Sequence, residues 1–268
     1  MKRMFATLGL IALVTACADS DGDGLGNGAE RRLGTNPDVV DSDMDGVADG
    51  DEVDAGLDPL NADTDGDTYL DGDEQLMGKD PLDAASKIYE GGWPFSATKS
   101  DIVDPGYTLR AAIGNVIPNF HGVDQFGQEV ELYDYAHQGK DVMIDISAQW
   151  CGPCRQMADW MDGGSMAGMG EFESVRTAVA SGDILWITIM NENNAGNAPS
   201  AATANAWYND YPNEKIAVLA DTEQIMARVF HLGFYPSLYL VDENMVYVKG
   251  PTTDDWSPPL SEAVARLQ

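Results

Sequence analysis

The fold of this chain is decided by one stretch, VMIDISAQWCGPCRQMADWM, which covers residues 142–161. Its first six residues form a mainly apolar run around Asp145, which predicts a buried strand. Pro153 suits the first turn of a helix, which we expect to continue to the end of the stretch. Cys151 and Cys154 therefore lie at a strand-to-helix junction, where unpaired backbone N–H groups and the helix dipole lower a thiol pKa and favour the thiolate.

The spacing of the two cysteines predicts redox chemistry. Cys154 lies one helical turn beyond Cys151, within reach to close an intramolecular disulfide and expel a product. A purely structural disulfide is disfavoured, because so short a loop removes little entropy from the unfolded chain. A zinc site needs four ligands, and the sequence has no second cysteine pair. The three histidines are interpreted as surface or core residues: His121, His137 and His231.

Apolar runs and helical periods alternate along the rest of this region. Strands are predicted at 184–190, 216–220, 237–241 and 245–248, the last two as a hairpin around residues 242–244. Helices are predicted at 171–180, 200–209, 222–231 and 259–267. This alternation predicts an α/β fold, with a mixed central sheet and helices on both faces.

Residues 107–268 resemble the thioredoxin superfamily, and specifically the exported TlpA/ResA-like thiol–disulfide oxidoreductases. The resemblance is carried by Trp150-Cys151-Gly152-Pro153-Cys154, by Phe234-Tyr235-Pro236-Ser237 and by the lead-in at residues 118–120 and 127–132. It implies the thioredoxin fold, with an added N-terminal hairpin, and thiol–disulfide exchange in which Cys151 attacks and Cys154 resolves.

The same resemblance implies roles for three further residues. Asp145 lies six residues before Cys151, where the family has a buried proton acceptor with a raised pKa. Pro236 is expected to be the cis-proline that faces the motif, and Trp150 precedes the attacking cysteine. Thioredoxins have Thr or a β-branched residue before that proline, so Tyr235 implies a different substrate range here.

A second pattern precedes this region. An acidic frame starts at Asp19, Asp41 and Asp63, a constant period of 22 residues that Gly34, Gly56 and Gly78 and three prolines also keep. Residues 18–105 hold 24 Asp and Glu against 5 Lys and Arg. A disordered acidic spacer is disfavoured, because it has no reason to keep such a register.

The spacing within each repeat suits a calcium loop. Carboxylates at positions 1, 3 and 5, a carbonyl at 7, an oxygen at 9 and a bidentate Glu at 12 match the ligand number of Ca²⁺ better than that of Mg²⁺. The candidate ligands are Asp19, Asp21, Asp23, Asn27, Glu30, Asp41, Asp43, Asp45, Asp49, Glu52, Asp63, Asp65, Asp67, Asp71 and Glu74.

Glycine at loop position 6 permits a sharp turn, and the third loop has Thr68 there, so we expect a strained or different turn. The frame resembles thrombospondin type 3 repeats over residues 19–83. The resemblance implies structural calcium sites that stiffen a stalk, with an adhesive role as the alternative, and we expect this segment to fold only when the cation is bound.

The N-terminus has the pattern of an export signal. Lys2 and Arg3 precede the apolar run of residues 5–14, which is too short to span a membrane. Val14-Thr15-Ala16-Cys17 resembles the bacterial lipobox, which implies cleavage after residue 16 and lipidation of Cys17. Ala18 in place of Asp favours sorting to the outer membrane.

The predicted organisation is a signal peptide at 1–16, calcium repeats at 17–83, a linker at 84–106 and the thioredoxin-like domain at 107–268. The formal net charge of −30 argues against nucleic acid or a polybasic membrane patch as a binding partner. No redox cofactor is expected beyond the Cys151–Cys154 disulfide.

These features predict an extracytoplasmic, lipid-anchored enzyme of the cell envelope that exchanges disulfides in exported proteins, as a reductase or isomerase. A reductase would need electrons from a membrane protein of the DsbD or CcdA type. One alternative is a calcium-dependent adhesion protein with a thioredoxin-like scaffold. A thiol peroxidase is disfavoured, because Ala148 and Ile144 occupy positions where peroxiredoxins need Thr or Ser and Pro.

Overall fold

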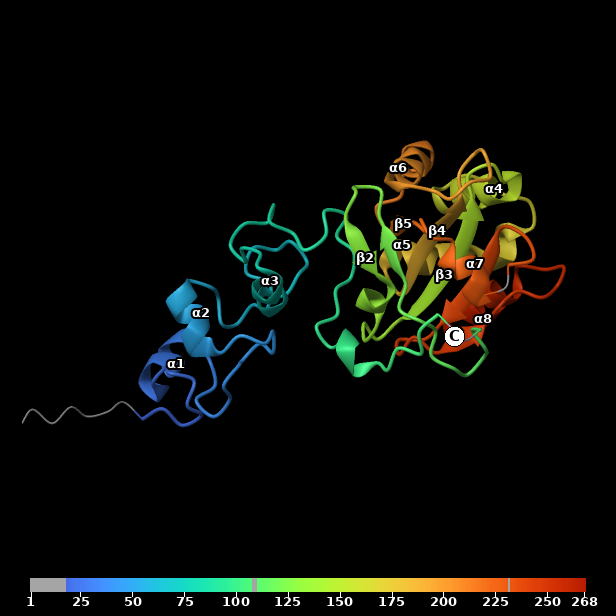
Figure 1. Ribbon diagram of the computed structural model, residues 1–268. Coiled ribbons are helices and arrows are strands. Elements are labelled where there is room, and N and C mark those ends of the chain that lie inside the picture. The colour runs from blue at the N-terminus through green and yellow to red at the C-terminus, as the bar shows by residue number, and fades with distance from the viewer. Residues whose placement is uncertain (1–17, 108–109, 231) are drawn as a thin grey trace, which may run out of the picture. The chain divides into compact units, whose positions relative to one another are not determined.

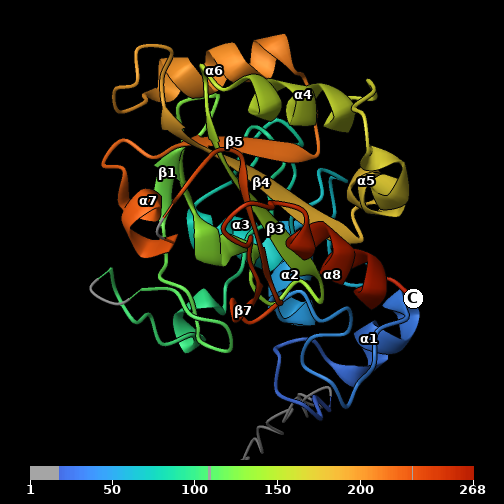
Figure 2. The ribbon, with the colours of Figure 1, turned by 90° about the vertical axis from the view of Figure 1, so that its right-hand side faces the viewer.

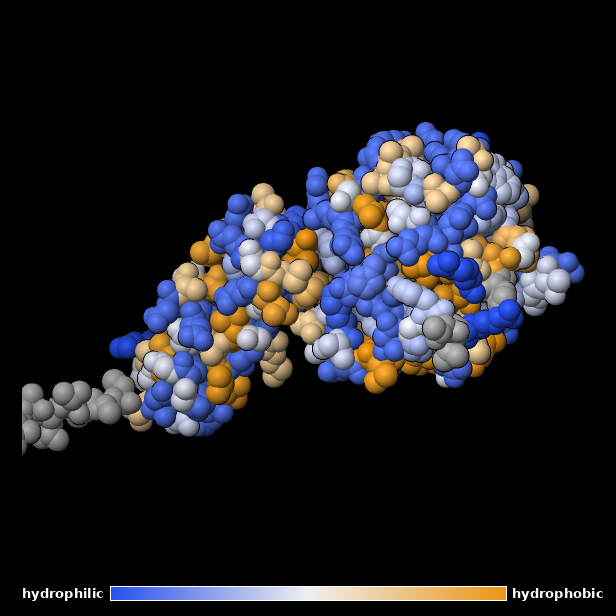
Figure 3. Space-filling view, in the orientation of Figure 1, coloured by the Kyte–Doolittle hydropathy of each residue, from blue (hydrophilic) through white to orange (hydrophobic). Residues whose placement is uncertain are grey.

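The computed structural model describes residues 18–107, 110–230 and 232–268, which divide into two compact units, one up to Lys87 and one from Ile88 onward (Figure 1). The predicted signal peptide, Cys17 and His231 lie outside the described residues. None of the described helices is long and apolar enough to cross a membrane. Hydrophilic side chains predominate on the face shown in Figure 3, as the net charge demands.

Each repeat of the first unit is a loop followed by a short helix. The helices are α1 (Asn27–Leu33), α2 (Asp49–Ala55) and α3 (Asp71–Met77), of seven residues each. Each ends at a glycine in the left-handed region, whose N–H donates to a carbonyl of the last turn. The sequence analysis did not predict these helices, because single turns with few apolar residues carry little periodicity.

The second unit contains a seven-stranded sheet in the order β2-β1-β5-β4-β3-β6-β7. Its strands are β1 (His121–Val123), β2 (Glu129–Glu131), β3 (Asp141–Ala148), β4 (Ile184–Glu192), β5 (Ile216–Ala220), β6 (Ser237–Val241) and β7 (Tyr247–Lys249). Strands β3, β4 and β5 are parallel, whereas β6 is antiparallel to β3 and β7 is antiparallel to β6. This strand order, with the CGPC motif directly after β3, is the thioredoxin fold with an added N-terminal hairpin, as expected.

The helices of this unit are α4 (Gly152–Met161), α5 (Glu173–Ser181), α6 (Ala201–Asp210), α7 (Ile225–Phe230) and α8 (Pro258–Arg266). Short 3-10 turns occur at Lys99–Asp101, Leu132–Tyr135 and Met169–Phe172. The helix predicted at 222–231 begins later, at Ile225, because the Asp221 carboxylate accepts the N–H groups of Ile225 and Met226.

The helices cover the two faces of the sheet unequally. Side chains of α4, α5 and α8 share one core cluster with Trp186 of β4 and Leu238 of β6. Helix α7 packs on the opposite face, because its Phe230 stacks on Tyr239, which alternates with Leu238 along β6. Figure 2 shows α4 and α6 on one side of the sheet and α7 away from them.

The segment expected to be a linker is partly built into the second unit. Tyr89 and Trp93 are buried, the Tyr89 hydroxyl donates to Asp134 at 2.6 Å, and the Trp93 indole N–H donates to Asp124 at 2.9 Å. Glycine and proline in this segment suggest a linker, but its aromatic residues gain more free energy by burial than by exposure.

Candidate active site and metal sites

The CGPC motif lies at the junction of β3 and α4, and its two cysteines form a disulfide with the Cα atoms 5.3 Å apart. Cys151 is the N-cap residue of α4, and its Sγ accepts the backbone N–H of Cys154 at 3.2 Å. That contact and the helix dipole would stabilise a thiolate on Cys151 once the disulfide is reduced. The arrangement thus places the more easily ionised sulfur at the start of the helix.

Cys151 is buried, although it follows an exposed tryptophan. Trp150 is 49 % exposed, whereas Cys151 is only 2 % exposed and Cys154 is fully buried. Tyr235 packs against the cluster of side chains that contains both cysteines, and its ring meets that of Trp150 edge-on at 5.8 Å. Tyr235 thus joins the side-chain cluster that holds the disulfide to the exposed Trp150.

A polar network at the end of β4 joins these two aromatic residues. The Trp150 indole N–H donates to Glu192 at 2.8 Å, the Tyr235 hydroxyl donates to the other carboxylate oxygen at 3.3 Å, and Asn191 donates to that hydroxyl at 2.5 Å. Burial raises the pKa of Tyr235 to about 12, so its hydroxyl remains protonated at neutral pH.

Asn191 and Glu192 were not among the site residues predicted from the sequence. Glu192 pairs with Ala148 across the parallel strands β4 and β3, which brings it to the edge that carries the motif. The sequence did contain a signal for them: two polar residues directly follow the apolar run of β4. Because the carboxyl ends of parallel strands meet at one edge of a sheet, such residues are expected near the motif that follows β3.

Pro236 follows Tyr235 through a cis peptide bond, immediately before β6. Because β6 is hydrogen-bonded to β3, this loop lies at the end of the strand that leads to the motif. The structure thus brings Trp150, Cys151, Cys154 and the loop before Pro236 to one edge of the sheet.

Asp145 is buried in the middle of β3, 2 % exposed. Burial raises the pKa of its carboxyl group to about 7, although hydrogen bonds from Ser147 at 2.8 Å and Thr188 at 3.4 Å oppose the shift. Asp145 lines a small cavity together with Trp207 and Val218, which also pack in the cluster around Cys154. The carboxyl group and the second cysteine therefore share neighbours.

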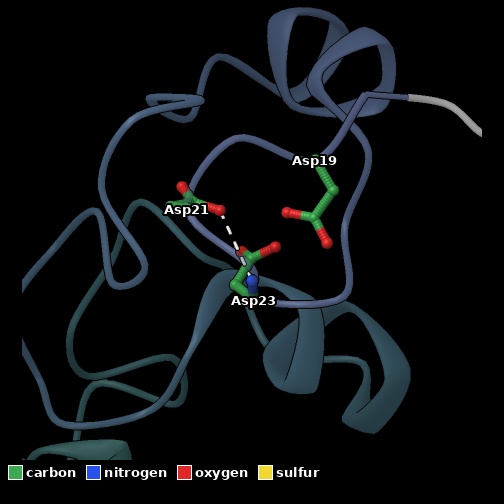
Figure 4. Close-up of side chains that lie close together, drawn as sticks. All are labelled: Asp19, Asp21 and Asp23. Carbon is green, nitrogen blue, oxygen red and sulfur yellow. Dashed lines mark hydrogen bonds between the residues drawn. The ribbon is translucent and has the colours of Figure 1, made fainter.

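The acidic residues of the first unit gather in two kinds of cluster. Within each loop, the three aspartates at positions 1, 3 and 5 place carboxylate oxygens within 4.8 Å of one another. Figure 4 shows the first of these, with the carboxylates of Asp19, Asp21 and Asp23 around a common centre. The three loop clusters are Asp19, Asp21, Asp23; Asp41, Asp43, Asp45; and Asp63, Asp65, Asp67.

The second kind of cluster joins neighbouring repeats. Asp49 lies beside Asp23 and Glu30 of the preceding repeat, and Asp71 lies in the same way beside Asp45 and Glu52. The sequence analysis assigned Asp49 and Asp71 to their own loops. In those loops they accept the backbone N–H groups of Ser42 and Thr64, at 2.7 and 2.9 Å.

The acidic clusters fit a hard cation. Glu30, Glu52 and Glu74 are fully buried, and neither of their carboxylate oxygens accepts a hydrogen bond within the described residues. Burial and then the neighbouring aspartates raise the pKa of Glu52 and of Glu74 to about 8. Buried carboxylates without partners are costly, and a bound Ca²⁺ would neutralise their charge and be coordinated by their oxygens.

Asn27, at position 9 of the first loop, makes the contact that Asp49 makes in the second. Its side-chain amide donates to the Ser20 hydroxyl at 2.6 Å, whereas Asp49 accepts from the Ser42 hydroxyl at 2.7 Å. The Oδ1 atom of Asn27 is buried and accepts no hydrogen bond within the described residues.

Backbone geometry is the same in all three loops. Position 6 has a positive φ of 92° at Gly24, 100° at Gly46 and 90° at Thr68. The expected strain at Thr68 is therefore present, because a threonine adopts the conformation that the other loops give to glycine.

Comparison with known proteins agrees with this division. Residues 19–37 and 41–62 match the bacterial TSP3 repeat family, which covers most of the first repeat and all of the second. The expected similarity to thrombospondin type 3 repeats is thus confirmed for those residues. No curated protein matches the sequence of the chain.

Among solved structures, the chain is similar to a protein assigned as the thiol:disulfide interchange protein DsbE from Chlorobium tepidum, with 22 % identity, a TM-score of 0.42 and coverage of 58 % of this chain and 94 % of that one. The chain is also similar to the thioredoxin domain of a thiol-disulfide oxidoreductase from Bacteroides vulgatus, with 16 % identity and a TM-score of 0.42. That match covers 58 % of this chain and 97 % of the other. A thiol peroxidase from Chromobacterium violaceum is similar with 14 % identity and a TM-score of 0.39, over 59 % of this chain and 88 % of that one. These scores assign no activity, and the fold assignment above rests on strand order.

Proposed function

We propose that this chain is an exported thiol–disulfide oxidoreductase that exchanges disulfides in other exported proteins, as a reductase or isomerase. The observation that carries the proposal is the Cys151–Cys154 disulfide at the start of α4, with the Cys151 sulfur accepting a helix N–H. The loop before the cis Pro236 lies at the same edge of the sheet. Together these supply an attacking sulfur, a resolving sulfur and a neighbouring loop for a client chain.

The exchange runs in two balanced steps. The Cys151 thiolate attacks one sulfur of a client disulfide, forming a mixed disulfide and releasing the other client sulfur as a thiolate. The Cys154 thiolate then attacks the Cys151 sulfur, which expels the second client thiolate and leaves the Cys151–Cys154 disulfide. Asp145 accepts the proton that Cys154 loses. A membrane dithiol donor of the DsbD or CcdA type would return two electrons for the next cycle.

The first unit serves this enzyme as a calcium-stiffened stalk. Its clustered carboxylates hold the ions, and the mature N-terminus would be a lipidated Cys17 that fixes the protein to the periplasmic or outer face of the envelope. This anchoring has its own test. Cys17→Ser should move the protein from the membrane fraction to the soluble fraction without changing its exchange activity, and retention in the membrane would remove the lipoprotein proposal.

Trapping experiments test the proposed reaction. Cys154→Ala retains the attacking thiol but lacks the resolving one, so mixed disulfides with client proteins should accumulate through residue 151. Cys151→Ala should trap nothing, and the wild-type chain should reduce insulin with a dithiol donor. Trapping by Cys151→Ala instead would reverse the two roles, and failure of both variants and of insulin reduction would reject the oxidoreductase.

The direction of the exchange follows from the reduction potential of the Cys151–Cys154 couple. A potential near about −250 mV would support a reductase, and one near about −120 mV an oxidase.

A further inference from the structure

A groove with a volume of about 760 Å³ lies beside Trp150, the residue that precedes Cys151. Trp150 and Tyr235, whose rings meet edge-on, form one wall. The end of β4 and residues on and around α7 form the others. The polar and charged residues that line the groove are Asn191, Glu192, Glu223, Gln224 and Arg228. This volume lies in the range of sites that accept a large side chain or a small ligand.

The hydrogen bonds along one wall have a fixed direction. The Trp150 indole nitrogen can only donate, and an ionised Glu192 can only accept. Tyr235 therefore donates its hydroxyl proton to Glu192 and accepts the amide N–H of Asn191. The side-chain N–H₂ group of Asn191 therefore points to the tyrosine hydroxyl. The other polar atom of this side chain, the carbonyl oxygen Oδ1, is left to bind elsewhere.

That remaining end has no partner. Asn191 is 2 % exposed, and its Oδ1 accepts no hydrogen bond from any described residue. An unpaired buried acceptor destabilises the protein unless a ligand supplies the missing donor. Asn191 is one of the residues that line the groove, and the natural complement of its buried acceptor is an N–H group.

The charge of the groove points to a cationic donor. Glu192 and Glu223 both line it, and the carboxylate of Glu192 retains lone pairs beyond the two hydrogen bonds that it accepts. Arg228 is the one basic residue among those that line it, and its charge also acts on Asp221: burial raises the pKa of that carboxyl group, and Arg228 is among the groups that oppose the rise. A net charge of −30 over the whole chain also attracts cations.

We propose that this groove binds the side chain of a residue close to the client cysteine and selects Lys or Arg at that position. When a client cysteine is joined to Cys151, the residues next to that cysteine lie within a few ångströms of it, since an extended chain advances about 3.3 Å per residue. The inference rests on the proposed function and adds the substrate class to it: clients with a basic residue beside the exchanged disulfide.

The test uses the full calcium-bound chain, reduced beforehand and freed of reductant. Symmetric disulfide dimers of the peptide Gly-X-Cys-X-Gly, capped at both ends, are compared with X as Lys, norleucine or Glu. The rate of enzyme oxidation is divided by the rate at which dithiothreitol reduces the same dimer, which corrects for the effect of X on the leaving thiol.

Glu192→Gln and Asn191→Leu probe the groove, and Glu223→Gln, at an exposed residue, probes its charge without threatening the fold. Glu171→Gln, which removes an exposed charge outside the groove, is the matched control.

We expect the corrected rate for Lys to exceed that for Glu by roughly tenfold in the wild-type chain and in Glu171→Gln. The ratio should fall severalfold in the three groove variants. Equal corrected rates for Lys and Glu, or a ratio that Glu192→Gln and Glu223→Gln leave unchanged, would overturn this inference while insulin reduction still supported the oxidoreductase. Failure of every peptide and of insulin to oxidise the enzyme would reject the proposed function and the groove together.

Discussion

Asp145 links the protonation of the active-site region to the stability of the fold. Its pKa is raised by burial from an ordinary value of 3.8 to about 7, so between these two pH values the folded chain binds a proton that the unfolded chain lacks. Stability from this group is complete below about pH 4 and is lost as the pH rises towards 7. The loss amounts to at most about 4 kcal/mol, at 1.36 kcal/mol per pH unit.

Asp145→Asn keeps the shape of the side chain and removes this titration. We expect the variant to gain stability over the wild type as the pH rises from 4 to 8, because the wild-type carboxyl group must ionise in an apolar environment. Urea unfolding of the oxidised chain at several pH values, at saturating calcium, measures this difference. Parallel stability curves for the two proteins would show that Asp145 is ionised throughout.

The side chain of Thr68 destabilises the third loop through backbone strain. It adopts a φ of 90° at position 6 of the third loop, and its side chain is exposed. We expect Thr68→Gly to stabilise the calcium-bound repeats by about 1 kcal/mol, because glycine adopts this conformation without strain. Calcium-saturated thermal unfolding measures the effect.

The reverse substitution in the second loop provides the control for Thr68. Gly46→Thr introduces the same side chain at a φ of 100° and should destabilise the repeats by a similar amount. The strain argument fails if both substitutions shift the unfolding temperature in the same direction.

At the scale of elements, contact between repeats depends on a glycine in each later helix. A Cβ atom at Gly50 of α2 would lie 2.4 Å from the carbonyl oxygen of Asp23, and one at Gly72 of α3 would lie 2.3 Å from that of Asp45. Gly28 has the same place in α1 but meets nothing within 4 Å, since no described repeat precedes it. Helices α2 and α3 thus pack directly on the acidic loop of the preceding repeat.

We expect Gly50→Ala to destabilise the repeats and weaken calcium binding, because the methyl group must push α2 away from the first loop. Gly28→Ala should instead be neutral or stabilising by up to about 1 kcal/mol, the helix propensity difference alone. Calorimetric calcium titration and thermal unfolding of both variants make the comparison. Equal behaviour of the two alanines would contradict the packing between repeats.

Some elements could be predicted from sequence because their signals are local. The 22-residue period and the apolar run that ends in CGPC fix the repeats and the strand-to-helix junction. Asn191 and Glu192 escaped prediction because their position depends on the parallel register that sets Glu192 opposite Ala148. The packing of Tyr235 on the cluster that contains Cys151, 84 residues earlier in the chain, escaped prediction in the same way. Such long-range packing leaves no periodic trace in the sequence.

At the scale of the whole molecule, the two units are stabilised by different forces. Among the described residues of the first unit, the buried hydrophobic residues are Val47, Leu57 and Tyr69. Their burial cannot offset the repulsion among the buried carboxylates of the same repeats. The second unit has an extensive apolar core on both faces of its sheet. Calcium should therefore be required by one unit and not by the other.

We expect chelation of calcium from the full chain to unfold residues 18–87 and to leave the second unit folded. Hydrogen exchange with and without calcium measures both parts at once: protection of α1, α2 and α3 should disappear, while protection of β3 and β4 should be retained. Half-saturation is expected on the order of 10⁻⁴–10⁻³ M, the range of extracellular calcium modules, and Mg²⁺ at equal concentration should not substitute.

If chelation left the repeats protected, their carboxylates would have to be neutralised by protons, and raising the pH from 6 to 9 would then unfold them without any chelator. If chelation also exposed β3 and β4, the redox unit would depend on calcium for its stability, and removal of calcium would inhibit the enzyme directly.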